Sequence, residues 1–303
     1  MENYQKEMYK EKAIRGESQF PVGFYRITDL QSVQILPYHW HKEFEIIYMT
    51  KGTALFQIDD ECYEVKEGQA IFINGGRLHS GLSANNQPCS YDAIVFELEA
   101  LADFSDKCIE YLKDIKMNRI IIRSYYTDEN YWEQELLHNI KEISTSLYKQ
   151  EYGFHLAVKG RLLLLFSILL ANGAYSTNIK GNIPLTENVE RMKIVIQYIQ
   201  EHYQNKITID ELAAQLNMNR HYFCRFFKKI TGITAVDYMN GYRADRAAAL
   251  IEATSISIME AGMEAGFDNF SYFIRIFKRF KNCTPSEYRK IQNEKHNEKN
   301  MSE

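Results

Sequence analysis

The fold is decided by two stretches in the last third of the chain, ITIDELAAQLNMNRHYFCRFFKKITGITAVDYM (Ile207–Met239) and SISIMEAGMEAGFDNFSYFIRIFKRFKNCTPSEYR (Ser255–Arg289). When they are aligned at an offset of 50 positions, seven residues between Tyr222 and Tyr238 are identical to their counterparts. The identical pairs are Tyr222 and Tyr272, Phe223 and Phe273, Arg225 and Arg275, Phe227 and Phe277, Lys228 and Lys278, Thr234 and Thr284, and Tyr238 and Tyr288. Such self-similarity indicates a duplicated supersecondary unit.

The first copy has the pattern of a helix-turn-helix. Apolar residues recur at helical spacing from Ile209 to Leu216, which predicts a short amphipathic helix. Either Thr208 or Asp210 is suited to cap its start, because their side-chain oxygens accept hydrogen bonds from free backbone N–H groups. We expect Asn219 to cap a second helix with a buried stripe, formed by Phe223, Phe226, Phe227 and Ile230.

The second copy repeats this layout with a weaker first helix. Ile258 and Ala265 mark that helix, and Gly266 is expected to end it. Asp268 or Asn269 can cap the next helix. Its predicted core stripe consists of Phe273, Ile276, Phe277 and Phe280.

In both copies the second helix leaves an arginine on its outward face, Arg225 or Arg275. A helix fits the major groove of DNA, where each base pair shows its own pattern of donors and acceptors, and an arginine can bind guanine through two hydrogen bonds. Phosphate contacts fix the register without reading the sequence. We expect them from Arg220, Lys228, Lys229, Lys278 and Arg279. The alternative, ordinary core helices with solvated basic residues, is disfavoured because the pattern occurs twice.

The spacing of further residues resembles the AraC/XylS family of transcription regulators. Ala235–Ala253 joins the copies as one long helix, and the signature continues through Gly266-Phe267, Phe273, Phe277-Lys278, Thr284-Pro285 and Tyr288-Arg289. The resemblance covers Ile194–Lys290 and implies seven helices with two recognition helices in successive major grooves. It places base-reading roles on His221, Cys224, Arg225, Ser271, Tyr272 and Arg275.

Three positions depart from the family pattern. Asn219 replaces a usual serine, Ala261-Gly262 replaces isoleucine and alanine, and Asn282 replaces a glycine. A small core residue and a mid-helix glycine predict a second unit that is weaker by roughly 1–3 kcal/mol.

Composition places these units in a globular chain of two domains. The 303 residues are 45% hydrophobic and 25% charged. Residues 183–290 contain 15 Lys and Arg against 12 Asp and Glu, whereas the whole chain contains 36 against 40. The five cysteines have neither paired nor metal-type spacing, and the first residues have no apolar signal region. We therefore expect a reduced, cytoplasmic chain with no membrane partner.

Residues 21–102 have the texture of a β barrel or sandwich, with short alternating runs separated by turn residues. His39-Trp40-His41, Glu45 and Gly52 match the first cupin motif, and Gly68 with Asn74-Gly75-Gly76 and His79 resembles the second. This region therefore looks like a cupin-type jelly roll. Aromatic side chains that could be either pocket wall or core are Trp40, Tyr48, Phe56 and Phe96.

We expect His39, His41, Glu45 and His79 to converge in this barrel and bind a small organic effector. A sugar or another small polar molecule suits such donors and acceptors. The same four residues are also a plausible metal set. Sensor domains that resemble this one commonly keep the fold and bind an organic ligand, so no metal and no cofactor are predicted.

Residues 103–173 turn helical and predict a hairpin of two helices. The second helix is apolar nearly all round, so it must be buried on more than one side. The run Leu162–Ala171 is too short to span a bilayer. Packing of the hairpin on its own barrel would bury one side of this helix. A dimer interface, which the resemblance also implies, would bury the other side as well. We favour the interface.

The complete expectation is an α+β chain of two domains. The segments are a flexible N-terminus at 1–20, the cupin-like barrel at 21–102, the dimerisation segment at 103–173, a linker at 174–187, the DNA-binding domain at 188–290 and a flexible tail at 291–303. The predicted function is a ligand-responsive transcription regulator without enzyme activity, whose partners are double-stranded DNA, a small-molecule effector, a second copy of the chain and, as a further candidate, RNA polymerase. The alternative is a metal-dependent cupin enzyme fused to a DNA-binding domain.

Overall fold

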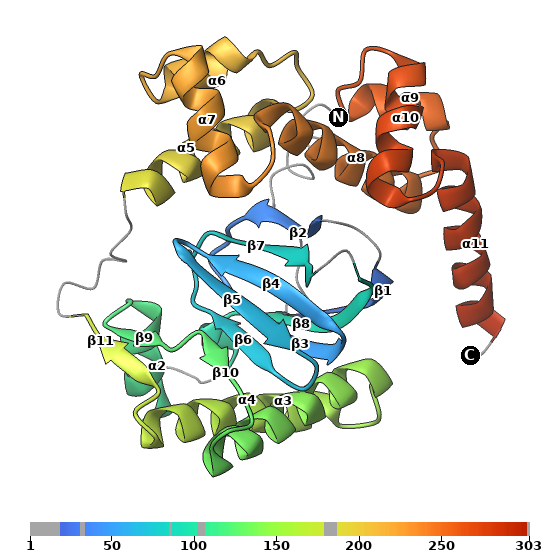
Figure 1. Ribbon diagram of the computed structural model, residues 1–303. Coiled ribbons are helices and arrows are strands. Elements are labelled where there is room, and N and C mark those ends of the chain that lie inside the picture. Colours follow the sequence, from blue (N-terminus) through green and yellow to red (C-terminus); the bar gives the residue numbers. More distant parts are fainter. Residues whose placement is uncertain (1–18, 31–33, 85–86, 102–106, 179–186, 302–303) are drawn as a thin grey trace. The chain divides into compact units, whose positions relative to one another are not determined.

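The computed structural model describes residues 19–30, 34–84, 87–101, 107–178 and 187–301. The chain forms two compact units, Met1–Val189 and Glu190–Glu303. All described strands belong to the first unit, and the second is helical (Figure 1). This is the predicted order of a β-rich domain followed by an all-α domain.

The first unit is built on two antiparallel sheets, with strand orders β1-β8-β3-β6-β10 and β2-β7-β4-β5. The strands are β1 Val22–Leu30, β2 Gln34–His39, β3 Phe44–Lys51, β4 Thr53–Ile58, β5 Glu61–Lys66, β6 Ala70–Ile73, β7 His79–Ser83, β8 Cys89–Phe96 and β10 Tyr125–Tyr126. Buried side chains of both sheets pack between them; the rings of Phe56 on β4 and Tyr91 on β8 lie 5.9 Å apart. This arrangement confirms the predicted jelly roll.

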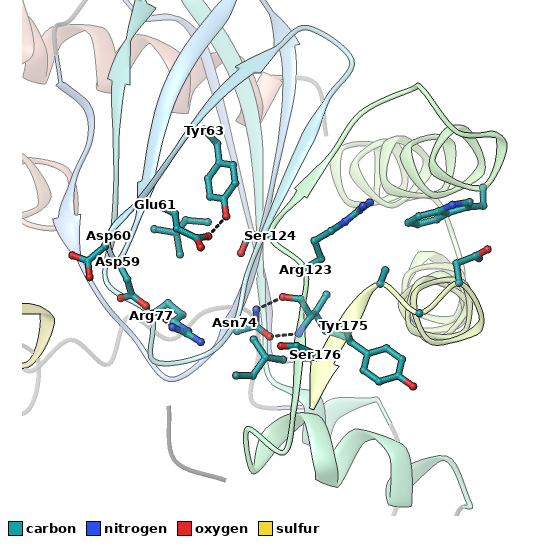
Figure 2. A pocket seen from close by; sticks show the side chains of 17 residues that line it. Asp59, Asp60, Glu61, Tyr63, Asn74, Arg77, Arg123, Ser124, Tyr175 and Ser176 are labelled. Atoms are coloured by element: carbon teal, nitrogen blue, oxygen red, sulfur yellow. Dashed lines mark hydrogen bonds and ion pairs between the residues drawn. The ribbon is translucent and has the colours of Figure 1, made fainter. Parts of the chain in front are cut away.

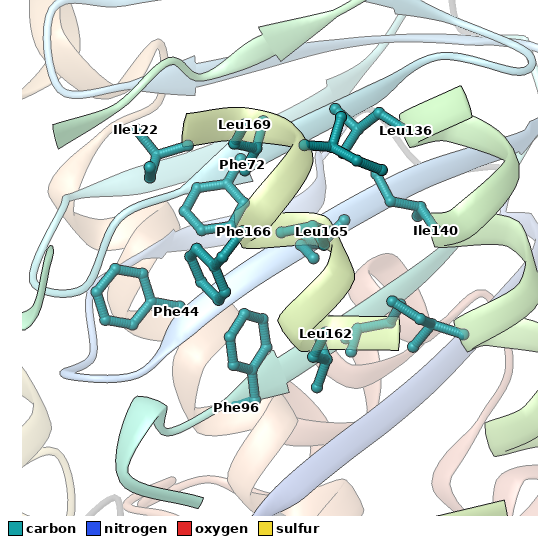
Figure 3. Packing of buried hydrophobic residues seen from close by; sticks show 14 of the residues in the cluster. Phe44, Phe72, Phe96, Ile122, Leu136, Ile140, Leu162, Leu165, Phe166 and Leu169 are labelled. Atoms are coloured by element: carbon teal, nitrogen blue, oxygen red, sulfur yellow. The ribbon is translucent and has the colours of Figure 1, made fainter. Parts of the chain in front are cut away.

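A helical hairpin covers the outer face of the five-stranded sheet. It consists of α3 (Tyr131–Lys149) and α4 (Phe154–Ala171). Phe166 of α4 packs edge-on against Phe72 and Phe96, with ring centroids 6.0 and 6.2 Å apart (Figure 3). Phe96, which the sequence left open as pocket wall or core, therefore belongs to the core, as does Phe56.

The exposed face of α4 differs from the expectation that the helix is buried on more than one side. Leu156 is 80% exposed and Leu164 44% exposed in the single chain. By length and composition alone, the whole of α4 is long and apolar enough to cross a membrane, unlike its shorter part Leu162–Ala171. Its other face, which includes Leu162 and Leu165, is part of the core of this unit.

Short elements precede and follow this hairpin, and two of them are strands in segments that the sequence predicted as helix and linker. They are η2 Leu98–Ala100, α2 Cys108–Lys116, β9 Ile120–Ile122 and β11 Tyr175–Thr177. β11 opens the predicted linker but pairs with β9 and so belongs to the first unit. The expectations for 1–18 and 179–186 lie outside the described residues.

The second unit contains two helix-turn-helix pairs joined by one long helix. Its helices are α5 Glu187–His202, α6 Ile209–Gln215, α7 Arg220–Thr231, α8 Ala235–Ala253, α9 Ile258–Glu264, α10 Phe270–Lys281 and α11 Pro285–Met301. The pairs α6–α7 and α9–α10 flank α8 (Figure 1). α11 extends to Met301, into the segment predicted to be a flexible tail.

The ends of these helices follow the predicted capping. Thr208 forms a capping box with Glu211, and Asn219 and Asn269 each accept a hydrogen bond from a backbone N–H of the helix that follows. Gly232 ends α7 at φ 73°, and Asn282 ends α10 at the equivalent position at φ 59°. Asparagine tolerates this left-handed conformation, so the replacement of the usual glycine keeps the helix end.

Gly262 has a packing role that the sequence analysis missed. A Cβ at this position would lie 2.6 Å from Cδ1 of Phe273, whose ring is fully buried. The absent side chain therefore provides space for the central core ring of α10. The predicted weakening by a mid-helix glycine is thus offset by this close packing.

We predict that Gly262→Ala lowers the free energy of unfolding of the second unit by about 1–2 kcal/mol, because overpacking against Phe273 outweighs the gain in helix propensity. Chemical denaturation of the full chain measures the change. Met263→Ala is the control, since Met263 follows on the same helix and is 66% exposed; it should change stability by no more than about 0.5 kcal/mol. A more stable Gly262→Ala variant would refute the packing role.

Candidate DNA-reading face and effector site

The two recognition helices are fixed by equivalent aromatic contacts. Phe223 and Phe227 of α7 lie 5.8 Å apart, and Phe273 and Phe277 of α10 lie 5.6 Å apart. Phe227 contacts Tyr238 at 5.8 Å, and Phe277 contacts Tyr288 at 5.5 Å. All four phenylalanine rings are fully buried. Because one face of each helix is held in the core, the opposite face is directed to solvent.

The residues predicted to read bases lie on these outward faces. The side chains of His221, Cys224, Arg225, Ser271 and Arg275 are exposed, and that of Tyr272 is partly buried. Arg225 and Arg275 therefore occupy equivalent, solvent-accessible positions on α7 and α10. Both arginines are accessible in the same helical unit, as reading two grooves would require.

The predicted phosphate contacts Arg220, Lys228, Lys229, Lys278 and Arg279 are also exposed. Two of them form ion pairs, Arg220 with Asp210 at 3.0 Å and Arg279 with Asp237 at 2.7 Å. An exposed pair contributes only about 0–1 kcal/mol, so a phosphate can replace the carboxylate at small cost. The Arg279–Asp237 pair could not be predicted from the sequence, because the two residues lie 42 positions apart.

The four residues predicted to form the effector site converge inside the barrel. His39 ends β2 and pairs in register with His79, which begins β7. His41 lies in the loop before β3, and Glu45 lies within β3. Oε2 of Glu45 lies 3.0 Å from Nε2 of His41 and 3.0 Å from Nε2 of His79. One potential ligand atom from each residue lies within 4.8 Å of the others.

Backbone carbonyls orient all three imidazoles. Nδ1 of His39 lies 2.8 Å from the oxygen of Pro37, and Nδ1 of His79 lies 2.9 Å from that of Arg77. His41 contacts the Glu43 oxygen at 3.1 Å in the same way. A neutral ring that donates from Nδ1 has its lone pair on Nε2, the nitrogen that faces Glu45 or the other rings. To donate from Nε2 to Oε2 of Glu45 as well, His41 or His79 must be protonated, and a cation bound by the lone pairs could take the place of those protons.

Charge states in this cluster depend on burial and on the neighbours. Burial, followed by the repulsion of His79, lowers the pKa of His39 well below its usual value. Burial alone would raise the pKa of Glu45, but the hydrogen bonds from His41 and His79 hold it well below its usual range. The cluster therefore combines a carboxylate with at least one neutral imidazole, and both are ligands for divalent ions.

The dimensions of the cluster fit a single ion. First-row divalent ions bind imidazole nitrogen and carboxylate oxygen at about 2.0–2.2 Å, so ligand atoms around one ion lie within about 4.4 Å of each other. The observed limit of 4.8 Å is close to this span. A sugar ring cannot lie between the four side chains, because the same spacing leaves room for one atom. An organic ligand would have to contact the cluster from one side.

A separate cavity of about 610 Å³ offers the space that the cluster lacks (Figure 2). The β4–β5 turn, with Asp60 and Glu61, lies on one side of it, and Arg123 and Tyr175 lie on the other. Asn74 joins the two sides, since its side chain donates to the oxygen of Ile122 at 2.7 Å and accepts from its N–H at 3.0 Å. The cavity is of ligand size and mixed polarity.

The cavity and the cluster are neighbours along β4 and β7. None of His39, His41, Glu45 and His79 lines the cavity, but Ile58, which does, pairs in register with His79. Sequence analysis did not find this cavity, because half of its lining comes from β9, β11 and the segment between them, which were read as helix and linker.

Comparisons with known proteins match both units. The family model of an AraC-like ligand binding domain matches residues 21–123, and that of a helix-turn-helix domain matches residues 212–291. The HTH-type transcriptional regulator YdeC of Bacillus subtilis is 26% identical over 93% of this chain and 96% of its own length. The melibiose operon regulatory protein of Escherichia coli is 23% identical over 85% of this chain and 84% of its own length.

Among solved structures, ToxT from Vibrio cholerae is 18% identical and covers 90% of this chain and 98% of its own, with a TM-score of 0.45. The family models carry the assignment, since they match the barrel that holds the histidine cluster and the repeat that holds both recognition helices. The chain therefore belongs to the AraC-type family of transcription regulators, with an AraC-like ligand-binding domain followed by a helix-turn-helix DNA-binding domain.

Proposed function

We propose that this regulator reads two successive major grooves with Arg225 and Arg275, and that an effector bound in the first unit changes how the DNA-reading units of a dimer are placed. The single observation that supports the reading role is the exposure of these two arginines at equivalent positions of α7 and α10. Ligand must bind one arrangement of the dimer better than the other to have any effect. His221, Cys224, Ser271 and Tyr272 complete the proposed base-reading set.

Arg225→Ala should cost about 1–3 kcal/mol of binding and relax the sequence preference at one base pair, because a guanidinium that reads one guanine is lost. The test is electrophoretic mobility shift with a duplex selected by the full chain and with its single-base-pair variants. Unchanged sequence preference would reject the reading role of Arg225.

Lys228→Ala is the matched comparison on the same helix. It should weaken binding to all DNA sequences alike, because a phosphate contact does not read bases. It should also reduce the slope of log K against the logarithm of the salt concentration by about one, because that contact releases counterions. A loss confined to one base pair would instead make Lys228 a base-reading residue.

We place the organic effector in the cavity beside the cluster. Its carboxylates Asp60 and Glu61, the guanidinium of Arg123 and the rings of Tyr63 and Trp132 offer hydrogen bonds and stacking surfaces. A sugar or a similar polar molecule fits this chemistry. The relative named as a melibiose operon regulatory protein also supports a sugar as the effector class.

A second candidate role follows from the histidine cluster: His39, His41, Glu45 and His79 hold a divalent cation. Its support is the convergence of imidazole and carboxylate ligand atoms, with the three Nδ1 atoms already held by backbone carbonyls. When bound, such a cation would supply positive charge for an anionic or hydroxyl group of the effector. This proposal departs from the sequence-based expectation of a metal-free site.

We predict about one divalent transition-metal ion per chain in protein purified without a histidine tag, and its loss in His41→Ala and His79→Ala. Elemental analysis by mass spectrometry measures the content. His138→Ala is the control, since His138 is exposed on α3, and it should retain the metal. Wild-type protein that stays metal-free after reconstitution with Zn²⁺, Mn²⁺, Fe²⁺ or Ni²⁺ would contradict the cation site.

The same preparation separates the regulator from an enzyme fused to a DNA-binding domain. We propose that the chain has no enzyme activity, that it is cytoplasmic, and that it acts through DNA and RNA polymerase; the relatives named above are transcription regulators. A metal-loaded chain that turns over a small substrate would support the enzyme alternative, whereas sequence-specific DNA binding without turnover supports a sensor.

The exposed face of α4 supports a homodimer. Six exposed positions follow the 4-3 spacing of a coiled-coil seam. They are Gly153, Ala157, Gly160, Leu164, Ser167 and Ala171. Small side chains allow a second helix to approach closely, and among the described residues a Cβ at Gly160 would meet no atom of another element within 4 Å. A second copy of α4 would cover the apolar surface that the single chain leaves exposed.

Leu164→Glu should convert the dimer to a monomer at micromolar concentration, because an unpaired carboxylate buried in an apolar seam costs several kcal/mol. Sedimentation velocity measures the change. Met263→Glu places the same charge on an exposed methionine of the second unit and should leave the dimer intact. A Leu164→Glu variant that remains dimeric would move the interface away from α4.

A further inference from the structure

Asn240 connects α8 to the outward face of α10. It lies in the first half of α8 and is 5% exposed. Its Nδ2 donates a hydrogen bond of 2.8 Å to the hydroxyl oxygen of Tyr272, across 32 positions of the chain. A buried amide therefore holds the polar end of a side chain that otherwise faces the DNA-reading surface. The bond fixes the direction of the Tyr272 ring relative to the helix that joins both reading units.

The Tyr272 ring in turn supports Arg275. The guanidinium carbon of Arg275 lies 5.2 Å from the centroid of this ring, within the range of a cation–π contact. Phe267 packs against the same tyrosine, with ring centroids 6.2 Å apart. The ring is thus held at its hydroxyl by Asn240 and packed against Phe267, and it presents its face to the arginine.

The first helix-turn-helix unit has the same tyrosine and arginine without this support. Tyr222 is 49% exposed. In the part of the chain that the structure describes, its hydroxyl has no hydrogen-bond partner and its ring has no contact with Arg225. The repeat therefore contains one braced arginine and one free arginine in equivalent positions.

We propose that Asn240 is a positioning residue for base recognition, which acts through Tyr272 to hold Arg275 in the orientation that reads its base pair. An arginine side chain has much rotamer freedom, and an arginine that is already oriented loses less of it when it binds. The second unit therefore discriminates its base pair more strictly than the first unit does. This inference rests on the proposed reading role of Arg275 and adds a residue that cannot itself reach DNA.

The experiment uses the full chain and a pool of duplexes with a randomised core, from which the wild-type protein selects its site. Affinities are then measured for the selected duplex and for every single-base-pair variant of it. Arg275→Ala identifies the base pair that Arg275 reads, because discrimination is lost there and kept elsewhere.

Tyr272→Phe removes the hydroxyl and keeps the ring, and Asn240→Ala removes the donor. Each should reduce discrimination at the Arg275 base pair by about 3- to 10-fold, the value of one hydrogen bond. The double variant should lose no more than either single variant, because both changes break the same bond. The control Tyr222→Phe removes the equivalent hydroxyl of the first unit and should leave discrimination at the Arg225 base pair unchanged.

The outcomes separate the possible failures. If the wild-type chain selects no sequence, or Arg275→Ala loses discrimination nowhere, the proposed reading function fails. If Arg275→Ala loses it but Tyr272→Phe retains it, only the positioning role of Asn240 is overturned. A uniform loss of affinity at all duplexes in Tyr272→Phe would show a structural role instead, and this conservative variant decides the question even if Asn240→Ala does not fold.

Discussion

The burial of phenylalanine pairs on α7 and α10 is the constraint on which the DNA-reading surface depends. Phe223 with Phe227 and Phe273 with Phe277 are fully buried, and each pair is closed by a tyrosine at an equivalent distance. This packing sets the rotation of each recognition helix about its axis. Because an arginine two residues after the first phenylalanine is about 200° further round the helix, it must point away from the core. The arginines are exposed as a consequence of what the phenylalanines bury.

The features that could be predicted from sequence are those set by short-range chemistry. Caps, helical stripes and the 50-residue repeat depend on neighbours within a few positions, and Thr208, Asn219 and Asn269 occupy the predicted caps. The four cluster residues could also be predicted, because motif spacing on paired strands fixes their convergence. Contacts between residues far apart in the sequence could not be predicted, and the hydrogen bond between Asn240 and Tyr272 is one of them. Gly262 is another such contact: a helix-propensity rule does not include the Phe273 ring, which would meet a Cβ at this position.

The effector site shows how identical residue types can imply different ligands until distances are known. Three imidazoles and a carboxylate suggested hydrogen bonds to a polar molecule, and the sequence holds no information on how far apart their ligand atoms lie. Their ligand atoms lie within 4.8 Å of one another, so the space between them is of atomic size, whereas the larger cavity lies beside them. That cavity is formed with β9 and β11, which are three residues each and too short to leave a periodic signal.

The joining helix limits how an effector can act. α8 has 19 residues, so it is about 28 Å long. α10 contacts the first half of α8 through Asp237 and Asn240, and α7 contacts it through Tyr238, so the same part of this helix holds both recognition helices. Since α8 is continuous and its first half contacts both α7 and α10, packing within one chain sets the spacing of the two recognition helices. In the proposed dimer, an effector in the first unit would therefore act by changing the placement of one copy's reading unit relative to the other copy's. The proposed seam on α4 would connect the effector site to the second copy, because the opposite face of α4 packs against the barrel.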